Sequence, residues 1–238
     1  MPDPDPSRRV MTTNTNLLLE VMPDDDRAAL IKSATRIKLK LGDDIIAPGQ
    51  MIEVVHFPLS GIISTVNEMA DGRSVEAFMV GREGVAGVEA TTIPMRSGSR
   101  QTIQLDGEAL RIDAARVRAL TAERPGLRTV LAVYHAGVQR ELEQTAACHA
   151  LHQSERRLAK WLLRCHDRAD SDLIKLTQEY MAAMLGSQRT TVNEAAQLLQ
   201  AQGAVSYSRG KVRVLSREAL EAAACECYRK VSDHLPPD

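Results

Sequence analysis

The sequence predicts an α+β chain made of an N-terminal β jelly roll, a long helix and a C-terminal winged helix-turn-helix. From Thr35 to Ile112, short apolar runs are interrupted by glycine about every ten residues, which is typical of a roll or sandwich of short strands. After Ile112 the apolar residues recur with a helical period. Two short helical patterns and then two strand patterns follow between Leu176 and Val214.

Composition limits the class of protein. With 238 residues and 44% hydrophobic content, the chain is long enough for two modest domains with cores. The formal net charge is −1, but residues 151–238 hold 13 Lys and Arg against 11 Asp and Glu, whereas residues 1–150 hold 17 against 20. This contrast points to the C-terminal part as the one that meets nucleic acid.

We expect a cytoplasmic protein without a membrane partner. No stretch approaches the roughly 18 apolar residues of a membrane span, and the first sixteen residues lack the apolar core of a signal peptide. Residues 1–16 are rich in Pro, Asp, Ser and Thr, which predicts a disordered arm. The four cysteines, Cys148, Cys165, Cys225 and Cys227, are expected to be reduced thiols, because a chain of this size needs no disulfides.

The changes of pattern give the domain boundaries. Residues 17–122 form the expected roll domain, residues 123–152 the helix that leaves it, and residues 153–238 the helix-turn-helix domain. Residues 17–32 are expected to be helical, with Asp24 as a cap. The strands of the roll are expected at 36–40, 44–47, 53–59, 61–69, 74–80, 100–105 and 108–112.

A long helix is predicted from about Leu127 to beyond Ala150, after a short helix capped by Asp113. It carries an apolar seam with 4-3 spacing, interrupted by Glu141. The seam consists of Leu127, Leu131, Tyr134, Val138, Thr145 and Cys148, with Leu142 beside it. Since a hinge helix between two domains usually pairs with a second copy, we expect a dimerisation helix. The alternative is that the seam packs on the roll.

The helix-turn-helix is predicted from capping and turn residues. The Thr177 hydroxyl can cap the first helix, and Gly186 ends it. Ser187 is expected to cap the second helix, which ends at Gly203. Four residues of the second helix face a core at i, i+3, i+4 and i+7, namely Val192, Ala195, Ala196 and Leu199. Trp161, Leu158, Leu162 and Leu163 are expected in the core of the same domain.

The opposite face of the second helix carries short hydrogen-bonding side chains instead of the Lys and Glu pairs of an ordinary surface helix. Such side chains suit base edges in a DNA major groove. We therefore predict base contacts by Arg189, Thr190, Asn193 and Glu194, with Arg189 on a guanine. The alternative for Glu194 is a plain surface acid that repels phosphate.

The order of these parts resembles the Crp/Fnr superfamily of bacterial transcription regulators over Leu17 to Tyr228. The specific part is "LTQEYMAAMLGSQRTTVNEAAQLLQAQGAVSYSRG", with "ACECY" at 224–228 as in many alphaproteobacterial members. The resemblance implies a cyclic-nucleotide-binding-type roll and a homodimer on near-palindromic operators in double-stranded promoter DNA. It also makes RNA polymerase a candidate partner and the roll a candidate place for a regulatory signal.

Phosphate contacts are assigned to the basic wing, which is the pair of short strands expected on either side of a turn at 208–210, and to the starts of the two helices. The wing supplies Arg209 and Lys211, and the helix starts supply Thr177, Gln178 and Gln188. Gln178 matches a position from which family members donate to phosphate. The alternative for these residues is a solvated surface position.

The chain departs from the best-known family members in the part of the roll that would bind a signal and on the second helix of the helix-turn-helix, which is the recognition helix. Val88 follows Gly87 where cyclic-AMP-responsive members have Glu, and Gln101 follows Arg100 where they have Ser or Thr. Oxygen-sensing members use N-terminal cysteines for an iron–sulfur cluster, and this chain has no cysteine before Cys148. We therefore expect no cofactor, neither cyclic AMP nor an iron–sulfur cluster. Thr190 and Glu194 also differ from the family pattern. We therefore do not assign the operator sequence of the family to this chain.

No metal site is expected. A metal could use Cys148 with His149 and His152, or Cys165 with His166, but no CxxC or HxH spacing supports such a set. Cys225 and Cys227 are expected to diverge on a terminal helix as packing or surface thiols, with a redox switch as the lesser alternative.

We predict that the protein is not an enzyme. A metal-dependent jelly-roll enzyme needs several His residues inside the roll, and only His56 precedes the long helix. The sequence also lacks a Gly-rich phosphate loop and a nucleophile with a base. The alternative function is a ligand-binding or protein-interaction module that does not bind DNA. That alternative leaves the polar face of the recognition helix unexplained.

Overall fold

The computed structural model describes residues 15–230. Most of the expected disordered arm, residues 1–14, lies outside the described residues. Its last residue, Asn16, is ordered and buried. The Asn16 side chain accepts from Leu19 N at 3.1 Å and donates to the carbonyl oxygens of Pro58 and Gly84. Asn16 therefore caps α1 (Leu17–Glu20) and anchors it to the sheet.

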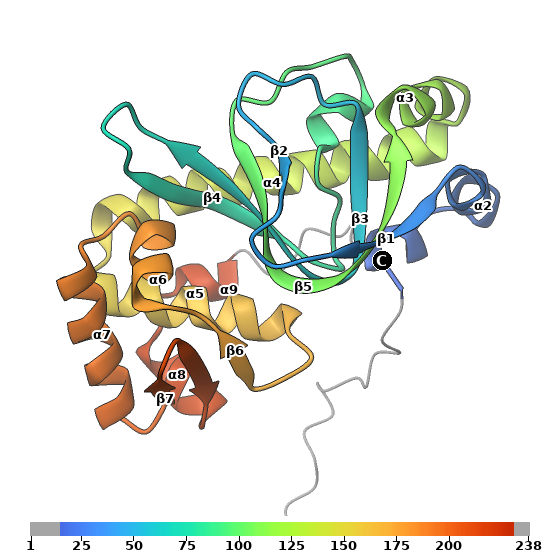
Figure 1. Cartoon of the computed structure of the whole chain (residues 1–238). Coiled ribbons are helices and arrows are strands. Elements are labelled where there is room, and N and C mark those ends of the chain that lie inside the picture. The colour runs from blue at the N-terminus through green and yellow to red at the C-terminus, as the bar shows by residue number, and fades with distance from the viewer. Residues whose placement is uncertain (1–14, 231–238) are drawn as a thin grey trace, which may run out of the picture.

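The N-terminal half is an antiparallel sheet with strand order β1-β5-β3-β4, and β2 pairs with β5. The predicted class, a β roll followed by a long helix and a helix-turn-helix, is confirmed (Figure 1). The strands are β1 (Thr35–Leu39), β2 (Asp44–Ile46), β3 (Val54–Glu68), β4 (Ser74–Val80) and β5 (Arg100–Asp113), with a 3-10 helix η1 (Val88–Thr91) between the last two.

β3 and β5 are each one long strand where two short strands were expected. The glycines that suggested a break lie at bulges inside these strands. Gly61 has φ +79, and a Cβ on Gly107 would lie 2.3 Å from the Ser60 carbonyl oxygen. The register of β3 against β5 shifts at these residues. Glycine here permits a close approach and a bend without ending the strand.

Two helices replace the single helix expected over residues 17–32. The helix α2 (Asp24–Lys32) starts after Pro23, which lies at the N-cap position assigned to Asp24. α3 (Ala114–Glu123) has Asp113 at its N-cap position as expected, but the Asp113 side chain makes no capping hydrogen bond. Buried Asp26 of α2 accepts from Leu127 N at 2.8 Å and pairs with Arg124 at 3.0 Å. This contact holds the start of the long helix against the N-terminal helices.

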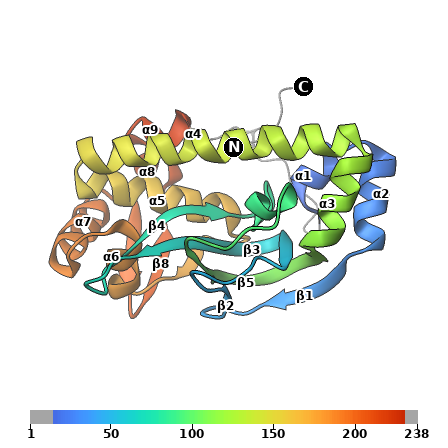
Figure 2. The same ribbon diagram turned by 90° about the horizontal axis from the view of Figure 1, so that it is seen from above.

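The long helix α4 (Pro125–Leu151) runs along one side of the roll (Figure 2). Four residues of the predicted dimer seam, Leu127, Leu131, Tyr134 and Val138, are at most 5% exposed and belong to the core cluster of the roll. Their assignment to a dimer contact is wrong. The roll offers α4 an apolar surface within its own chain, so the alternative holds for this part of the helix.

The second half of α4 faces the C-terminal domain. Of the remaining seam residues, Leu142 is 38% exposed, whereas Thr145 is half-buried near α5. Glu141, which interrupts the apolar seam, is buried and pairs with Arg164 of α5 (Ser154–Arg168). The polar residue in the seam therefore marks the place where α4 changes its packing partner.

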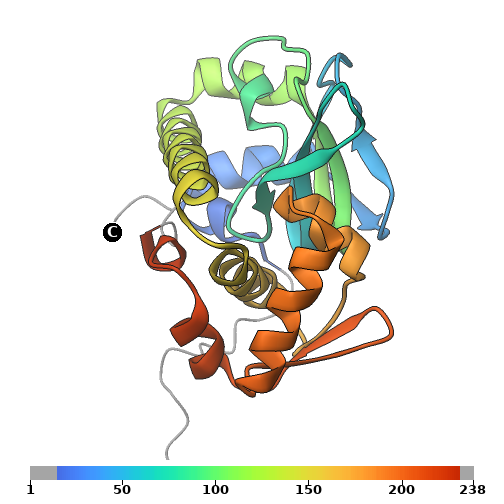
Figure 3. The same ribbon diagram turned by 90° about the vertical axis from the view of Figure 1, so that its left-hand side faces the viewer.

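The C-terminal domain contains a helix-turn-helix and a three-stranded wing (Figure 3). The helices are α6 (Gln178–Leu185), α7 (Arg189–Ala201), α8 (Arg217–Ala223) and α9 (Cys227–Lys230). The wing has strand order β6-β8-β7, and its strands are β6 (Leu173–Lys175), β7 (Val205–Ser208) and β8 (Lys211–Val214). β6 was not predicted. Its single buried residue, Ile174, leaves too short a pattern for a prediction.

The core of the C-terminal domain is shared with the roll. Trp161, Leu158, Leu162 and Leu163 are buried in it, as predicted. The same cluster includes Ile62, Val66 and Met79 from β3 and β4. The two domains are therefore packed against each other. Within the described part of the chain, no helix is long and apolar enough to cross a membrane.

Candidate nucleic-acid interface

The helix-turn-helix is held by local caps. Thr177 Oγ accepts from Tyr180 N at 3.0 Å, as predicted, and Gly186 ends α6 in the left-handed region at φ 57. The expected cap at Ser187 is wrong, because Gln188 lies at the N-cap position of α7. Ser187 Oγ instead donates to the Leu185 carbonyl oxygen at 3.4 Å. The turn between the helices therefore takes one residue more than the sequence suggested.

The two faces of α7 are as different as its sequence predicts. Val192, Ala195, Ala196 and Leu199 are at most 5% exposed. On the other side the predicted base-contacting residues Arg189, Thr190 and Glu194 are exposed, and Asn193 is half-buried. The helix thus presents a guanidinium, a hydroxyl and a carboxylate to solvent from its first two turns.

Asn193 and Gln178 are brought together by the fold. Gln178 Nε2 donates to Asn193 Oδ1 at 2.6 Å, so the two predicted contact residues tie α6 to α7. The Asn193 amide NH₂ and the second N–H of Gln178 remain the groups that can donate to DNA. The sequence did not indicate this pair, because its partners lie on different helices.

The wing is a tight hairpin with basic residues on its outer side. Arg209 and Gly210 have φ values of 48 and 75, the conformation of a two-residue hairpin turn. Lys211 and Arg213 are exposed, while the alternate residues of β8 are buried. Tyr207 Oη accepts from Gln178 N at 3.1 Å, which fixes the wing against the start of α6. Predicted phosphate-contact residues Thr177, Gln188, Arg209 and Lys211 are exposed, and Gln178 is half-buried.

On its other side, the domain is joined to the roll by buried polar contacts. Glu76 of β4 accepts from Trp161 Nε1 at 2.8 Å and from Ser64 Oγ at 2.5 Å. Burial raises the pKa of Glu76. The thioether sulfur of Met184 in α6 lies 3.8 Å from Ser64 Oγ. These contacts fix α5 and α6 on the edge strand of the roll.

A second contact is an ion pair between Arg168 at the end of α5 and Glu83, which follows β4. The N–O distance is 2.7 Å, and Glu83 also accepts from Gly81 N at 3.0 Å. Burial alone would raise the pKa of Glu83, but the nearby Arg168 charge and the backbone hydrogen bond together hold that pKa below its ordinary value. Within the C-terminal domain, Arg157 of α5 donates a hydrogen bond to the Leu185 carbonyl oxygen at the end of α6.

The roll contains a candidate ligand cavity of about 300 Å³ between β2, β3 and β5. Its lining residues are Ile45, Ile46, Gln50, Met51, Glu53, Val54, His56 and Gln101. Burial and then the Arg111 charge lower the pKa of His56 to about 4, so its imidazole is neutral at pH 7. Arg100, the residue nearest in sequence to the family's phosphate clamp, pairs with Asp44 and Glu68. The guanidinium of Arg100 is therefore engaged in two ion pairs within the roll.

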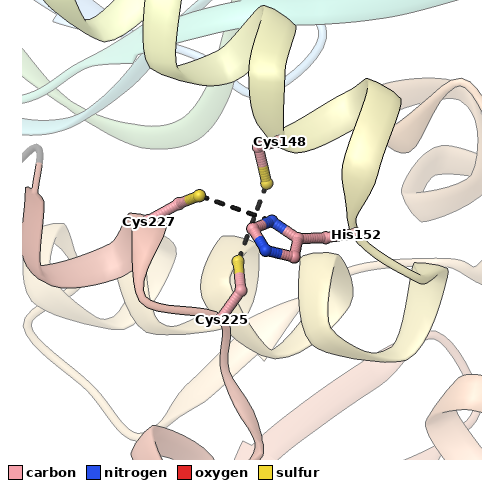
Figure 4. A group of neighbouring side chains, drawn as sticks. All are labelled: Cys148, His152, Cys225 and Cys227. Atoms are coloured by element: carbon pink, nitrogen blue, oxygen red, sulfur yellow. Dashed lines mark hydrogen bonds between the residues drawn. The ribbon is translucent and has the colours of Figure 1, made fainter.

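Four residues that the sequence did not group lie together at the end of α4. Cys148, His152, Cys225 and Cys227 point toward one another (Figure 4). The expectation that Cys225 and Cys227 diverge along a helix is wrong, because α9 begins only at Cys227. The C-x₃-H and C-x-C spacings are the only sequence signal for this group, and one lies at the end of the long helix while the other lies near the end of the helix-turn-helix domain.

Comparisons with known proteins agree with the helix-turn-helix and with the fold of the chain. Residues 156–223 match the Crp-like helix-turn-helix domain. Three solved structures have the same fold over most of the chain. FixK2 from Bradyrhizobium japonicum has a TM-score of 0.69 at 18% identity, covering 81% of this chain and 98% of its own. TTHA1359, a Crp/Fnr-family regulator from Thermus thermophilus, has a TM-score of 0.66 at 21% identity, covering 80% and 98%.

The third structure is the c-di-GMP responsive global regulator CLP from Xanthomonas campestris. It has a TM-score of 0.63 at 15% identity and covers 82% of this chain and 100% of its own. A search of curated proteins gave no match. At these identities the likeness concerns the fold.

Proposed function

Because the protein carries a Crp-like helix-turn-helix domain on the fold of the Crp/Fnr regulators, we propose that it is a sequence-specific DNA-binding transcription regulator. It acts as a homodimer on near-palindromic operators in promoter DNA, where RNA polymerase is a candidate partner.

The observation that carries the proposal is the contrast between the two faces of α7. The buried face holds the helix in its domain, and the exposed face offers Arg189, Thr190 and Glu194. A guanidinium matches O6 and N7 of guanine, and a carboxylate accepts from N4 of cytosine. We assign Arg189 to a guanine, with Thr190, Asn193 and Glu194 on neighbouring bases. We assign the exposed wing cations Arg209 and Lys211 to phosphate contacts.

We place the dimer contact on the outer face of α4. Leu142, Ala146 and Ala150 follow one another at i, i+4 and i+8 and are exposed, and Ala132 lies on the same side. Small side chains allow two helices to approach closely. In a two-fold dimer the α7 helices must lie about 34 Å apart to enter successive major grooves.

A regulatory signal is proposed to act through the cavity in the roll. Glu53, His56 and Gln101 give its wall polar groups, which favours a polar effector over an apolar one. The CLP regulator, of the same fold, is named as responsive to c-di-GMP. Here the cyclic-AMP motif is absent, so we do not assign that nucleotide. An effector changes DNA affinity only if it binds one arrangement of the dimer better than the other.

Selection of binding sites from random duplex DNA, followed by titration, tests the proposal. We expect one enriched near-palindromic sequence. R189A should weaken binding by about 1–3 kcal/mol and relax the preference at one base position in each half-site. The matched control is R116A, which removes an exposed arginine of α3 that hydrogen-bonds Ser33.

Two outcomes separate the alternatives. If no sequence is enriched and no selective shift occurs, with or without candidate nucleotides, the interaction-module function replaces this one. If a sequence is enriched but R189A and R116A bind it equally well, the protein binds DNA and the assignment of Arg189 is wrong.

A further inference from the structure

The group at the end of α4 brings together two separate pieces of the chain. Cys148 lies in the last turn of α4, and His152 occupies its C-cap position. Cys225 precedes α9, and Cys227 is its first residue. The three sulfur atoms and one imidazole nitrogen all lie within 4.8 Å of one another. All three thiols are free and at most 2% exposed.

The distances within the group fit the edges of a tetrahedron around one metal ion. Zinc binds cysteine sulfur at about 2.3 Å and histidine nitrogen at about 2.0 Å, so a tetrahedral site has S–S edges of roughly 3.8 Å and S–N edges of roughly 3.5 Å. The Cys148 and Cys225 sulfur atoms are 3.6 Å apart. The Cys227 sulfur lies 3.4 Å from His152 Nδ1. Figure 4 shows the four side chains converging from opposite sides on one point.

We propose that Cys148, His152, Cys225 and Cys227 form a binding site for a single zinc ion. Three thiolates and one imidazole are a ligand set that zinc takes in closed, structural sites. All four positions are filled by protein, so none remains for a water or a substrate. The ion is therefore structural.

Neighbouring residues support the four ligands. His152 Nε2 lies 3.3 Å from Glu226 Oε1, so the carboxylate can hold the imidazole with Nδ1 toward the metal. Gln144 Nε2 lies 3.0 Å from the Cys227 sulfur, where it can donate to a thiolate. The Lys160 ammonium lies near Cys148. Its cation offsets the net negative charge of three thiolates and one Zn²⁺.

Two other uses of these residues fit the group less well. A disulfide between Cys148 and Cys225 leaves the approach of His152 and Cys227 unexplained. An iron–sulfur cluster attaches its protein ligands to different iron atoms, which spreads them farther apart than one ion does. The four atoms within 4.8 Å of one another favour a single ion.

The position of the site gives the ion a mechanical role. His152 and Gln153 are the residues between α4 and α5, where the chain passes from the roll to the helix-turn-helix domain. Cys225 and Cys227 follow α8, which packs on α5. The ion therefore fastens the end of the domain to the hinge, and it fixes the direction in which α5 leaves α4.

Metal analysis of the full-length protein tests the site. We expect about one zinc per chain in protein purified under reducing conditions. H152A and C227S should retain less than about a tenth of this zinc, because a closed site needs all four ligands. The controls H149A and C165S change a histidine one turn away and a cysteine in the domain core, and they should retain the zinc.

Cobalt binding to the unaltered chain keeps the test valid if a variant fails to fold. After removal of zinc with a chelator, Co²⁺ should give the intense thiolate-to-cobalt absorption and the visible bands of a tetrahedral ion. Added Zn²⁺ should abolish both. The proposal is overturned by zinc-free protein that shows no cobalt bands, by equal zinc in H152A and H149A, or by protein containing iron and acid-labile sulfide.

Discussion

The outer face of α7 and the face that the same domain turns to the roll have opposite chemistry. The α7 face carries exposed polar side chains, of which Arg189, Thr190 and Glu194 stand in solvent. The roll-facing side carries charged and polar groups that are buried and engaged, such as Arg168 with Glu83 and Trp161 with Glu76. Exposed groups are available to a ligand, whereas buried paired groups hold the domain in place. The residues that recognise DNA and those that position the domain should therefore be separable by mutation.

The largest expected effect is on the roll contact. R168M leaves Glu83 charged and largely buried without its partner. Loss of one partner of such a pair lowers the free energy of unfolding by about 3 kcal/mol or more. Urea denaturation measures this effect. The double variant E83Q/R168M should recover most of the loss, since it leaves no uncompensated charge. Wild-type stability in R168M would show that the pair does not hold the domains together.

The pH dependence of stability should separate Glu83 from Glu76. The Arg168 charge and the Gly81 hydrogen bond outweigh burial and lower the folded-state pKa of Glu83. Glu83 therefore stabilises the fold above its unfolded pKa of about 4.3, and this contribution is lost as pH falls through the lower folded pKa. Burial raises the folded pKa of Glu76, so Glu76 favours the fold at low pH and loses that effect as pH rises above about 4.3.

Urea midpoints between about pH 3 and pH 7 measure both contributions. E83Q should reduce the loss of stability on acidification, because the group that takes up the proton is gone. E76Q should reduce the loss on going from acid to neutral pH. Curves for E83Q and E76Q that shift in the same direction would contradict the assigned causes.

The Gln178–Asn193 pair joins α6 to α7 and also carries groups that can face DNA. Two variants of Asn193 separate its effect on stability from its effect on DNA recognition. N193A removes the acceptor for Gln178 and should lower the free energy of unfolding by about 1 kcal/mol. N193D retains an acceptor for Gln178 but loses the amide donor that can face a base. If Asn193 contacts DNA, N193D should keep wild-type stability and lose preference at one base position. Unchanged base preference in N193D would leave Asn193 as a structural tie alone.

The smallest expected effect is at the wing. K211A should weaken binding to all sequences about equally and reduce the slope of log affinity against log salt by about 1, because one phosphate contact is lost. The base preference should stay as in the wild type. A salt slope that does not change in K211A would remove Lys211 from the DNA contact.

Local patterns allowed the helix-turn-helix to be predicted. The buried face of α7 and the cap at Thr177 depend on residues within two turns of each other, and both are confirmed. The glycines of the roll led to wrong strand boundaries, because their role depends on residues that are distant in sequence. Gly61 and Gly107 lie where β3 and β5 approach each other, a condition set by the paired strand and not by the neighbours in sequence.

Tertiary contacts explain what the sequence could not reveal. The apolar seam of α4 shows that Leu131 and Tyr134 are buried, but periodicity does not say whether a second copy or the roll covers them. Cys148 and Cys225 are 77 residues apart and meet only because α5 and α8 place them side by side. The exposed face of α7 shows that this surface is available, while its DNA partner stays a proposal.

The most direct test of DNA recognition by α7 is a substitution in the DNA itself. In the selected operator, each guanine is replaced in turn by 7-deazaguanine, which lacks the N7 acceptor, and the affinities of the wild type and R189A are compared. We expect one position per half-site at which the replacement weakens the wild type by about 1–3 kcal/mol and leaves R189A nearly unchanged. Equal losses for both proteins at every guanine would contradict recognition through Arg189.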